Sequence, residues 1–496
     1  MQKQKSIKGD SLKKNFVYQS SYRILSIILP FITAPYIARV LGSVGTGIYS
    51  YVNSVMYFFL MAANLGISNY GNREIASSVS DRKKLSEKFF GIYLCHALIC
   101  IICIISYIIY VLFIADNYKT IFMWQSIQLF ASLFDISWFF SGIQKFKVTV
   151  TRNFIIRVIT IISIFVFIKE PSDVWKYLLI NAIGNLVGQI VVWTQMKQYI
   201  TIVPIKAKDI ISHIKPLFIL FVPIIAMSVY RYMDKIMVKE LSEVSELGWY
   251  ENSEKIVELP LTLITTIGVV LLPKMSNIAS SGQVKEANKY FNLSMKYSMI
   301  FAFGLSAGLM GIAPVFAPVF FGIDFRPCGQ LIPLLAVTVV FLTISESIRS
   351  QFLVPNKKDN ASIVATFSGA MVNLIVNFIL IPVYGAKGAV IATIITEIIV
   401  AIIHILFTYK HLQYKSIFKT VFPFIFPSIV MVIVVRIIGD ILGESVLTIV
   451  IQVISGGTLF VLSVGSILYI QKDSYFISLI KTYGSKMGFR QLKNKN

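Results

Sequence analysis

The amino-acid sequence predicts an all-α membrane protein with about 14 transmembrane helices. Of its 496 residues, 56% are hydrophobic and only 14% are charged, whereas soluble globular proteins carry about 25% charged residues. Apolar runs recur from residue 16 to residue 471, and about 20 such residues cross the hydrocarbon core of a bilayer as a helix. The runs lack the alternation of a transmembrane β-barrel. We therefore expect most of the chain to lie in lipid as helices, which satisfy their own backbone groups.

The first crossing follows a lysine-rich start, MQKQKSIKGDSLKK, and has full spanning length. Because no short apolar region with a small-residue cleavage site is visible, we expect this helix to act as its own insertion signal. The other crossings follow as separate apolar runs with polar residues between them. The predicted crossings are 16–41, 47–68, 89–114, 120–141, 154–168, 176–199, 214–239, 253–275, 294–321, 330–354, 363–384, 389–411, 420–440 and 447–471.

Basic residues fall on alternate connections between these crossings. The segments on one side, including both termini, hold 32 lysines and arginines, whereas the opposite connections hold 5. Cytoplasmic loops of membrane proteins carry such an excess, so we predict that both termini are cytoplasmic. This placement explains the net charge of +22 without a nucleic-acid partner. The basic tail, residues 472–496, is either an amphipathic helix on anionic lipid or disordered.

A repeat at a separation of about 200 residues divides the chain. GIYSYV at 47–52 matches GWYENS at 248–253, and IASSVSDRKKLSEKFF at 75–90 matches IASSGQVKEANKYFN at 278–292. Six crossings per unit give both units one orientation, and two such bundles favour a transporter cavity that opens to alternate sides. We predict a first lobe, a second lobe, two extra helices and a tail, with bounds 1–213, 214–412, 413–471 and 472–496.

Ionisable side chains inside crossings identify a candidate site, because each costs about 2.5–3.5 kcal/mol on insertion scales. Arg231, Asp234 and Lys235 are spaced i, i+3 and i+4, which places them on one face of the seventh crossing. Glu258 in the eighth crossing has a similar predicted depth. These residues either line a cavity or form a closed salt-bridge network that only holds the two helices together.

Arg23 and Glu397 are further candidates. Arg23 lies in a polar, proline-bent part of the first crossing, and an arginine can hold a diphosphate through several parallel hydrogen bonds. It could equally pair with a backbone carbonyl or with Asp135. Glu397 lies deep in the twelfth crossing, where it is either a cation or proton site or a partner for the seventh crossing.

Motifs for enzymatic chemistry are absent from the sequence. Neither a Walker A loop nor H-E-x-x-H occurs, and the four histidines lack metal-ligand spacing. We predict that the chain is not an enzyme and has no metal site. We expect no cofactor. Energy could come from the membrane potential or from a cation gradient, and for a coupling sodium ion or proton Asp234, Glu258 and Glu397 are the candidate ligands.

Four sequence blocks resemble Wzx-type polysaccharide flippases of the multidrug/oligosaccharidyl-lipid/polysaccharide exporter superfamily. They are NFVYQSSYRILSIILPFITAPYIARVLGSVGTGIYSYVNSV, YRYMDKIMVKELSEVSELGWYENSEKIVELP, FFGIDF and IPVYGAKGAVIATIITE. The resemblance implies a bacterial plasma-membrane protein that moves an undecaprenyl-diphosphate-linked oligosaccharide from the inner to the outer leaflet. Polymerase machinery would then convert the product into capsule, exopolysaccharide or O-antigen.

The same resemblance implies roles for charged residues. Arg23 matches the family's first-helix arginine, and the stretch from Arg231 to Lys235 matches its charged seventh helix. We therefore expect Arg23, Arg231 and Lys235 to bind substrate. The predicted number of crossings, fourteen, departs from the twelve of many Wzx proteins. In this number the chain resembles the lipid II flippases instead.

Two other functions stay open on sequence alone. A multidrug antiporter of the same superfamily would need an acidic, aromatic cavity, and the bases of the first and seventh crossings argue against it. A membrane-embedded polysaccharide polymerase would need a large outer loop for its catalytic groups. The longest predicted outer loop, about 239–252, is short.

Overall fold

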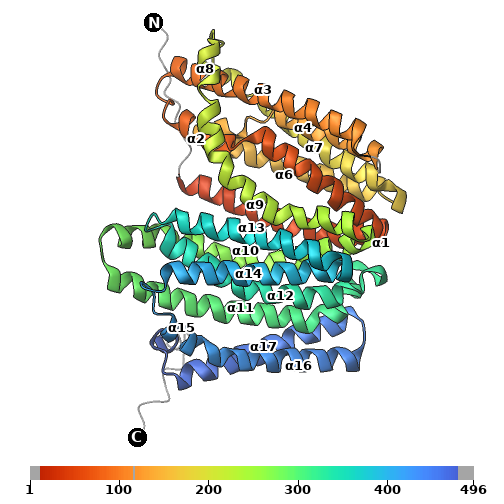
Figure 1. Cartoon of the computed structure of the whole chain (residues 1–496), viewed down its shortest axis with the longest axis vertical. Helices are drawn as coiled ribbons and strands as arrows, with labels where there is room; N and C mark the ends of the chain where they lie inside the picture. Colours follow the sequence, from red (N-terminus) through yellow and green to blue (C-terminus); the bar gives the residue numbers. More distant parts are fainter. Residues whose placement is uncertain (1–11, 116–117, 479–496) are drawn as a thin grey trace. The chain divides into compact units, whose positions relative to one another are not determined.

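The protein is described by a computed structural model that covers residues 12–115 and 118–478, with side chains for all of these except 12–30, 222, 223, 226, 227, 230 and 269. Throughout this part the chain forms helices and no strand, which confirms the predicted all-α fold (Figure 1). The α-helices are α1 Leu12–Asn64, α2 Ile67–Ala76, α3 Arg82–Phe113, α4 Lys119–Leu133, α5 Ser137–Gly142, α6 Phe146–Phe167, α7 Val174–Trp193, α8 Ala207–Ile211, α9 Ile214–Leu241, α10 Val244–Ser280, α11 Val284–Phe321, α12 Cys328–Ile348, α13 Asp359–Tyr384, α14 Ala386–Thr408, α15 Tyr414–Val421, α16 Ile425–Leu442 and α17 Val446–Ile470.

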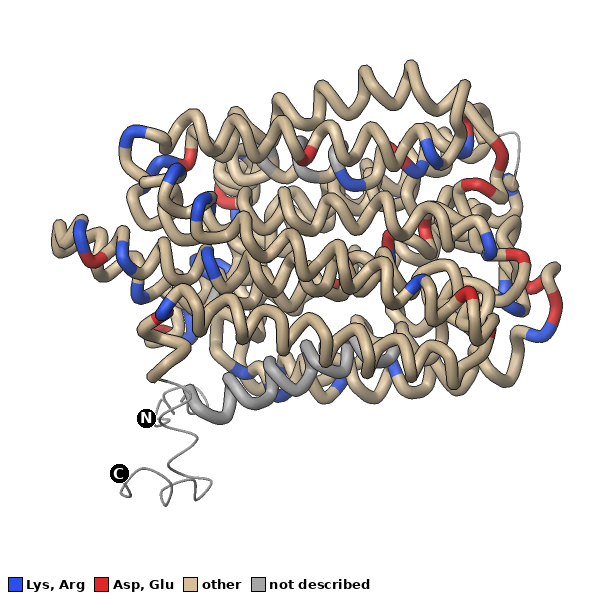
Figure 2. Tube along the Cα trace, turned by 90° about the horizontal axis from the view of Figure 1, so that it is seen from below, with Lys and Arg blue, Asp and Glu red and all other residues tan. Residues whose placement is uncertain are grey.

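Eleven helical segments of the described chain are long and apolar enough to cross a membrane. The protein is therefore a multi-pass membrane protein, as predicted. The predicted crossings coincide with these segments and with α4, α5 and α9. Figure 2 shows that charged residues gather mainly toward the helix ends, while the middle stretches are largely uncharged.

The first two predicted crossings both lie in α1, which consists of two helices joined at a kink. Gly42 interrupts this run with φ 67° and ψ −177°. Glycine adopts a positive φ without the steric cost that a Cβ atom imposes. The predicted connection at 42–46 is therefore a bend at one residue, after which the helix continues directly.

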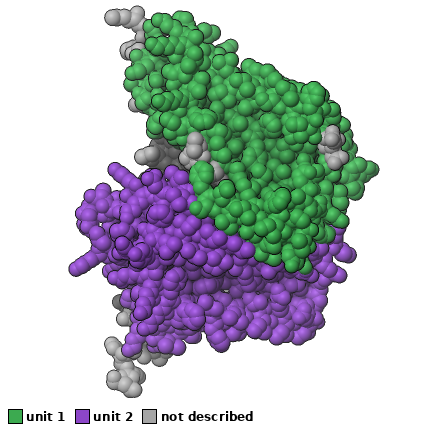
Figure 3. All heavy atoms as spheres, in the orientation of Figure 1, with its two compact units in different colours: residues 1–252, 366–392 green, residues 253–365, 393–496 purple. Residues whose placement is uncertain are grey.

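The chain divides into two compact units (Figure 3). Unit 1 comprises residues 1–252 and 366–392, and unit 2 comprises residues 253–365 and 393–496. The helices α10, α13 and α14 each contribute to both units. The bounds of the predicted lobes, 1–213 and 214–412, stay a prediction.

In unit 1, an aromatic core joins α2, α3 and α5. Phe89 is fully buried and stacks on Trp138 at 5.6 Å between ring centroids. A side chain at Gly71 would overlap the Trp138 ring, so this glycine lets α2 lie directly against α5. Asp81 caps the start of α3 by accepting hydrogen bonds from the backbone of Lys83 and Lys84.

In unit 2, α11 is the central helix and packs against α12, α16 and α17. An apolar cavity of about 1060 Å³ lies among α10, α11 and α17, and Gly304, Gly308 and Phe460 are among its lining residues. In the first half of α11, Lys296 forms an ion pair of 2.8 Å with Asp473, which follows α17. This pair ties the chain beyond the last membrane helix to α11.

Candidate functional site

A set of buried polar contacts lies where α9 turns into α10, within unit 1. We call Ser50, Asp234, Lys235, Tyr250, Glu251, Asn373 and Asn377 the α9–α10 cluster. Only residues 242 and 243 separate the two helices, so the end of α9 and the start of α10 lie side by side. The segment of α1 after Gly42 and the middle of α13 complete the cluster.

Asp234 is the acidic centre of the α9–α10 cluster. Its side chain is 4% exposed. Tyr250 Oη donates a hydrogen bond of 3.0 Å to Asp234 Oδ2, and Asn377 Nδ2 donates one of 2.7 Å to Asp234 Oδ1. A buried carboxylate requires such donors, because burial removes its hydration.

Two asparagines on α13 extend this arrangement. Asn373 and Asn377 are one helical turn apart, and Asn377 Nδ2 also donates to Asn373 Oδ1 at 3.1 Å. Both side chains are fully buried. Asn377 Oδ1 and Asn373 Nδ2 make no hydrogen bond in the described structure. A carboxylate and two carboxamides therefore stand together in the protein interior, with hydrogen-bonding capacity left over.

Lys235 forms the basic half of the cluster. Its ammonium group lies 2.6 Å from Glu251 Oε2, and both side chains are about one-tenth exposed. Ser50 Oγ donates a hydrogen bond of 2.8 Å to the same glutamate oxygen. Two successive residues of α10 thus contact two successive residues of α9. Tyr250 bonds to Asp234, and Glu251 pairs with Lys235.

The other predicted site residues lie elsewhere. Arg231 is on α9 one turn before Lys235, and its side chain is exposed. Glu258 is half-buried on α10, and Glu397 is buried on α14, both within unit 2. Arg23 belongs to α1, but its side chain lies outside the described residues. The structure brings Asp234 and Lys235 together in one cluster.

Five residues of the cluster were not among the sequence predictions. Tyr250 and Glu251 fall in the segment 239–252, which hydropathy assigns to a loop, whereas α10 already begins at Val244. Both residues lie in the repeated GWYENS motif, and this repeat could have marked them as candidates. The matching motif GIYSYV contains Ser50, which the same reasoning would have found. Asn373 and Asn377 are uncharged, so a search for ionisable residues passes over them. Their spacing of four in an apolar helix marks them as neighbours.

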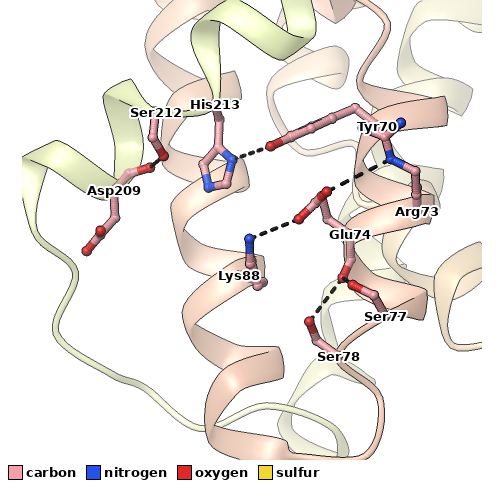
Figure 4. A network of polar contacts seen from close by, with 9 residues as sticks. All are labelled: Tyr70, Arg73, Glu74, Ser77, Ser78, Lys88, Asp209, Ser212 and His213. Atoms are coloured by element: carbon pink, nitrogen blue, oxygen red, sulfur yellow. Dashed lines mark hydrogen bonds and ion pairs between the residues drawn. The ribbon is translucent and has the colours of Figure 1, made fainter.

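A second polar arrangement joins α2, α3 and the start of α9, also within unit 1 (Figure 4). We call Tyr70, Glu74, Lys88 and His213 the α2–α3 network. Tyr70 Oη lies 2.7 Å from His213 Nδ1, and Lys88 Nζ lies 2.9 Å from Glu74 Oε2. Burial and the nearby Lys88 lower the pKa of His213, while Glu74 and Asp209 act in the opposite direction. The network secures the connection that leads into α9.

Comparison with known proteins finds one matching family and several relatives. Residues 12–279, more than half of the chain, match the family described as "Polysaccharide biosynthesis protein". The sequence is 24% identical over 397 residues to the "Putative O-antigen transporter" of Shigella dysenteriae, an alignment that covers 79% of this chain and 98% of that protein. The protein of the same name from Escherichia coli K12 is 21% identical over 279 residues, which is 55% of this chain and 67% of that protein.

The fold is similar to that of a solved structure, "Lipid II flippase MurJ, inward closed conformation". The TM-score is 0.76 at 16% sequence identity, and the superposition covers 92% of this chain and 99% of that chain. The resemblance to Wzx-type flippases that the sequence blocks indicated is thus confirmed by an independent family match and by the fold. The chain belongs to the polysaccharide biosynthesis protein family.

Proposed function

We propose that the protein is a flippase that moves an undecaprenyl-diphosphate-linked oligosaccharide from the inner to the outer leaflet of the bacterial plasma membrane. The observation that carries this proposal is the match to a protein named as an O-antigen transporter along 98% of that protein's length. The names of the relatives denote transport rather than an enzymatic reaction, in agreement with the prediction that the chain is not an enzyme. Both termini would lie in the cytoplasm, and polysaccharide polymerase machinery would receive the product.

Substrate binding in this proposal depends on basic residues within helices. A diphosphate that carries several sugars cannot cross hydrocarbon unaided, and arginine retains its charge at any physiological pH. Arg23 and Arg231 are the proposed diphosphate ligands, and the exposed position of Arg231 on α9 leaves it accessible. Lys235 would need to leave Glu251 before it could bind a phosphate, because the two now form a buried ion pair. Lys235 is therefore a substrate ligand only in a state in which that pair is open.

A coupling cation would bind in the α9–α10 cluster. Asp234 supplies a buried carboxylate, Asn377 faces it through its amide nitrogen, and Asn373 Oδ1 accepts a hydrogen bond from the same nitrogen. Oxygen donors of this kind suit sodium, and rotation of the Asn377 amide would present its unbonded oxygen to the ion. Buried carboxylates in membrane helices often serve such pathways. Sodium is the cation that this set of donors fits best, and a proton on Asp234 is the alternative. Glu258 and Glu397 are the remaining proposed positions for a cation or salt bridge.

Transfer between leaflets of liposomes tests the proposal. Purified protein is reconstituted with a fluorescent undecaprenyl-diphosphate oligosaccharide, and the fraction of lipid exposed to an external quencher is followed. We expect transfer by the wild type and a large loss with Arg23→Ala and Arg231→Ala. Arg326→Ala is the matched control, because Arg326 forms only a solvent-exposed pair with Glu444 among its described contacts. If the wild type moves no such lipid but exchanges organic cations for sodium or protons, the antiporter function replaces this one.

A further inference from the structure

An apolar groove lies within unit 2 among α11, α12, α16 and the short helix α15. Its volume is about 430 Å³, within the range of about 300–1,000 Å³ that small-molecule sites occupy. Two serines line the groove, Ser306 and Ser428. Both hydroxyl groups already donate hydrogen bonds to backbone carbonyl oxygens, at 2.6 Å and 2.8 Å. The groove therefore suits a hydrocarbon chain rather than a polar molecule.

The long direction of the groove follows α16. Ile425, Ile429 and Val432 line it on successive turns of this helix, and a helix rises by about 10 Å from residue 425 to residue 432 at 1.5 Å per residue. Ile429 is 53% exposed, so the groove opens on the side where lipid surrounds a membrane helix. A hydrocarbon chain that runs along α16 from the membrane surface fits this shape.

The helix α15 forms the end of the groove next to the start of α16. Its inner face is fixed in unit 2, because Tyr414, Ile417 and Val421 are buried in an apolar core. Tyr414 Oη also lies 2.5 Å from Thr408 Oγ1, at the end of α14. These contacts determine which face of α15 is turned outward.

The outward face of α15 carries two bases and two aromatic rings. Lys415, Phe418, Lys419 and Phe422 are all exposed. They are spaced i, i+3, i+4 and i+7, which places them on one side of the helix. Phe418 and Phe422 line the groove, so the two lysines stand beside its mouth. Within the described part of the chain neither lysine forms an ion pair.

From this arrangement we propose that the groove binds an anionic glycerophospholipid of the bilayer. Its phosphate would contact Lys415 and Lys419, and one acyl chain would run along α16. Ammonium groups donate strong hydrogen bonds to phosphate, and basic pockets between membrane helices bind anionic headgroups. The connection that contains these lysines is predicted to be cytoplasmic, and the cytoplasmic leaflet carries a negative surface potential. A zwitterionic headgroup would leave the two positive charges without a matching net charge.

This site is independent of the proposed function. The proposed diphosphate ligands, Arg23 and Arg231, belong to unit 1, whereas the groove and α15 belong to unit 2. An undecaprenyl tail is also much longer than the groove, which holds only part of one acyl chain. The phospholipid is thus a ligand of the protein in addition to the lipid that it would transport.

Native mass spectrometry of the full-length chain tests the headgroup contact. Delipidated protein in detergent is titrated with phosphatidylglycerol or with phosphatidylcholine of the same acyl chains, and the affinity for the first bound lipid is measured. We expect the wild type to prefer phosphatidylglycerol. Lys415→Gln/Lys419→Gln should lower its affinity for this lipid by up to about thirtyfold, since each base near anionic lipid contributes about fivefold. Lys285→Gln/Lys289→Gln is the matched control, because these lysines are exposed with the same spacing on α11 but do not adjoin the groove.

A second pair of variants tests the acyl-chain contact. Ile429→Trp places a larger side chain in the groove, and it should weaken the binding of both phospholipids without changing the preference between them. Ile433→Trp is the control. Ile433 lies one turn further along α16 and is also 53% exposed, but it does not line the groove. Because both positions are on the surface, the two substitutions should leave folding intact.

Other results would overturn the inference. Equal affinity of the wild type for the two phospholipids would show unselective contact with bilayer lipid only. If the variant at 415 and 419 keeps the preference, α15 does not hold the phosphate, and if Ile429→Trp binds like Ile433→Trp, the groove does not hold the chain. Displacement of phosphatidylglycerol by undecaprenyl diphosphate, with both lost in the lysine variant, would assign the groove to the transported lipid instead. A protein that binds phosphatidylglycerol as expected but transfers no undecaprenyl lipid would refute the proposed function alone.

Discussion

The α9–α10 cluster and the α2–α3 network both join helices of unit 1 through polar side chains, but they differ in burial and in the segments that they connect. In the cluster, Lys235 and Glu251 are about one-tenth exposed, and a bond links the two repeats. In the network, Lys88 is 35% exposed and Glu74 is 22% exposed, and the segments belong to the first repeat and the connection after it. An ion pair contributes less to stability the more solvent reaches it, whereas removal of one partner from a buried pair is costly. The difference predicts that removal of one partner destabilises the protein much more in the cluster than in the network.

Substitution of one partner of the buried pair should give the largest effect. We expect Glu251→Ala to lower the free energy of unfolding by about 3–5 kcal/mol, because Lys235 would remain buried without this carboxylate. The measurement is thermal or denaturant unfolding of the full chain in detergent micelles.

The matched control for this substitution is the double variant Lys235→Met/Glu251→Leu. Removal of both charges should recover most of the lost stability, since two apolar side chains carry no desolvation penalty. If the double variant is less stable than Glu251→Ala, the ion pair is not the source of the effect, and the comparison with the α2–α3 network loses its basis.

Asn377→Leu should have the next largest effect. It removes the 2.7 Å hydrogen bond to Asp234, and bonds to charged groups contribute about 1.5–3 kcal/mol. If sodium binds at Asp234, it should raise the melting temperature of the wild type relative to choline, because it would bind the folded state preferentially, and Asn377→Leu should abolish this rise. Asn181→Leu is the control, because Asn181 bonds to the backbone of its own helix. A variant that sodium still stabilises like the wild type would exclude Asn377 as a ligand.

The α2–α3 network should respond to pH rather than to sodium. Burial and Lys88 lower the pKa of His213, so below its ordinary pKa of 6.5 the unfolded chain binds a proton that the folded chain does not. Stability should therefore fall as the pH decreases from about 6.5 toward the lower folded pKa. His213→Gln should flatten this part of the stability profile, whereas the exposed His411, as His411→Gln, should leave it unchanged. An equal slope in all three proteins would show that His213 is not responsible.

The smallest effect is expected for the partly buried pair of Lys88 and Glu74 in the α2–α3 network. Glu74→Ala should change the free energy of unfolding by about 0–1 kcal/mol, since solvent screens its interaction with Lys88. The same unfolding assay measures this change beside that of Glu251→Ala. An effect as large as that of Glu251→Ala would mean that exposure does not distinguish the two regions.

The sequence predicted the helices well, because apolar runs of spanning length are long and strongly marked. It located the ends of helices poorly. Hydropathy ends a crossing where polar residues begin, yet Tyr250 and Glu251 continue α10 because protein, rather than lipid, surrounds them. A search for charged residues finds Asp234 and Lys235. It passes over Asn373 and Asn377, because asparagine is uncharged. Which partners a buried charge selects depends on contacts between distant segments, and no local pattern specifies them.

The hydrogen bond between Ser50 and Glu251 has a consequence for how such a protein can be built. Two identical half-length chains arranged about an axis would bring either two serines or two glutamates face to face. Two carboxylates in contact repel each other, and two serines could not hold the ammonium group of Lys235 as an ion pair. Halves that differ in sequence, as the two halves of one polypeptide do, can place a hydroxyl opposite a carboxylate on the axis. Joining the halves into one chain thus permits an asymmetric, charged contact on the axis, which a homodimer of the same architecture could not form.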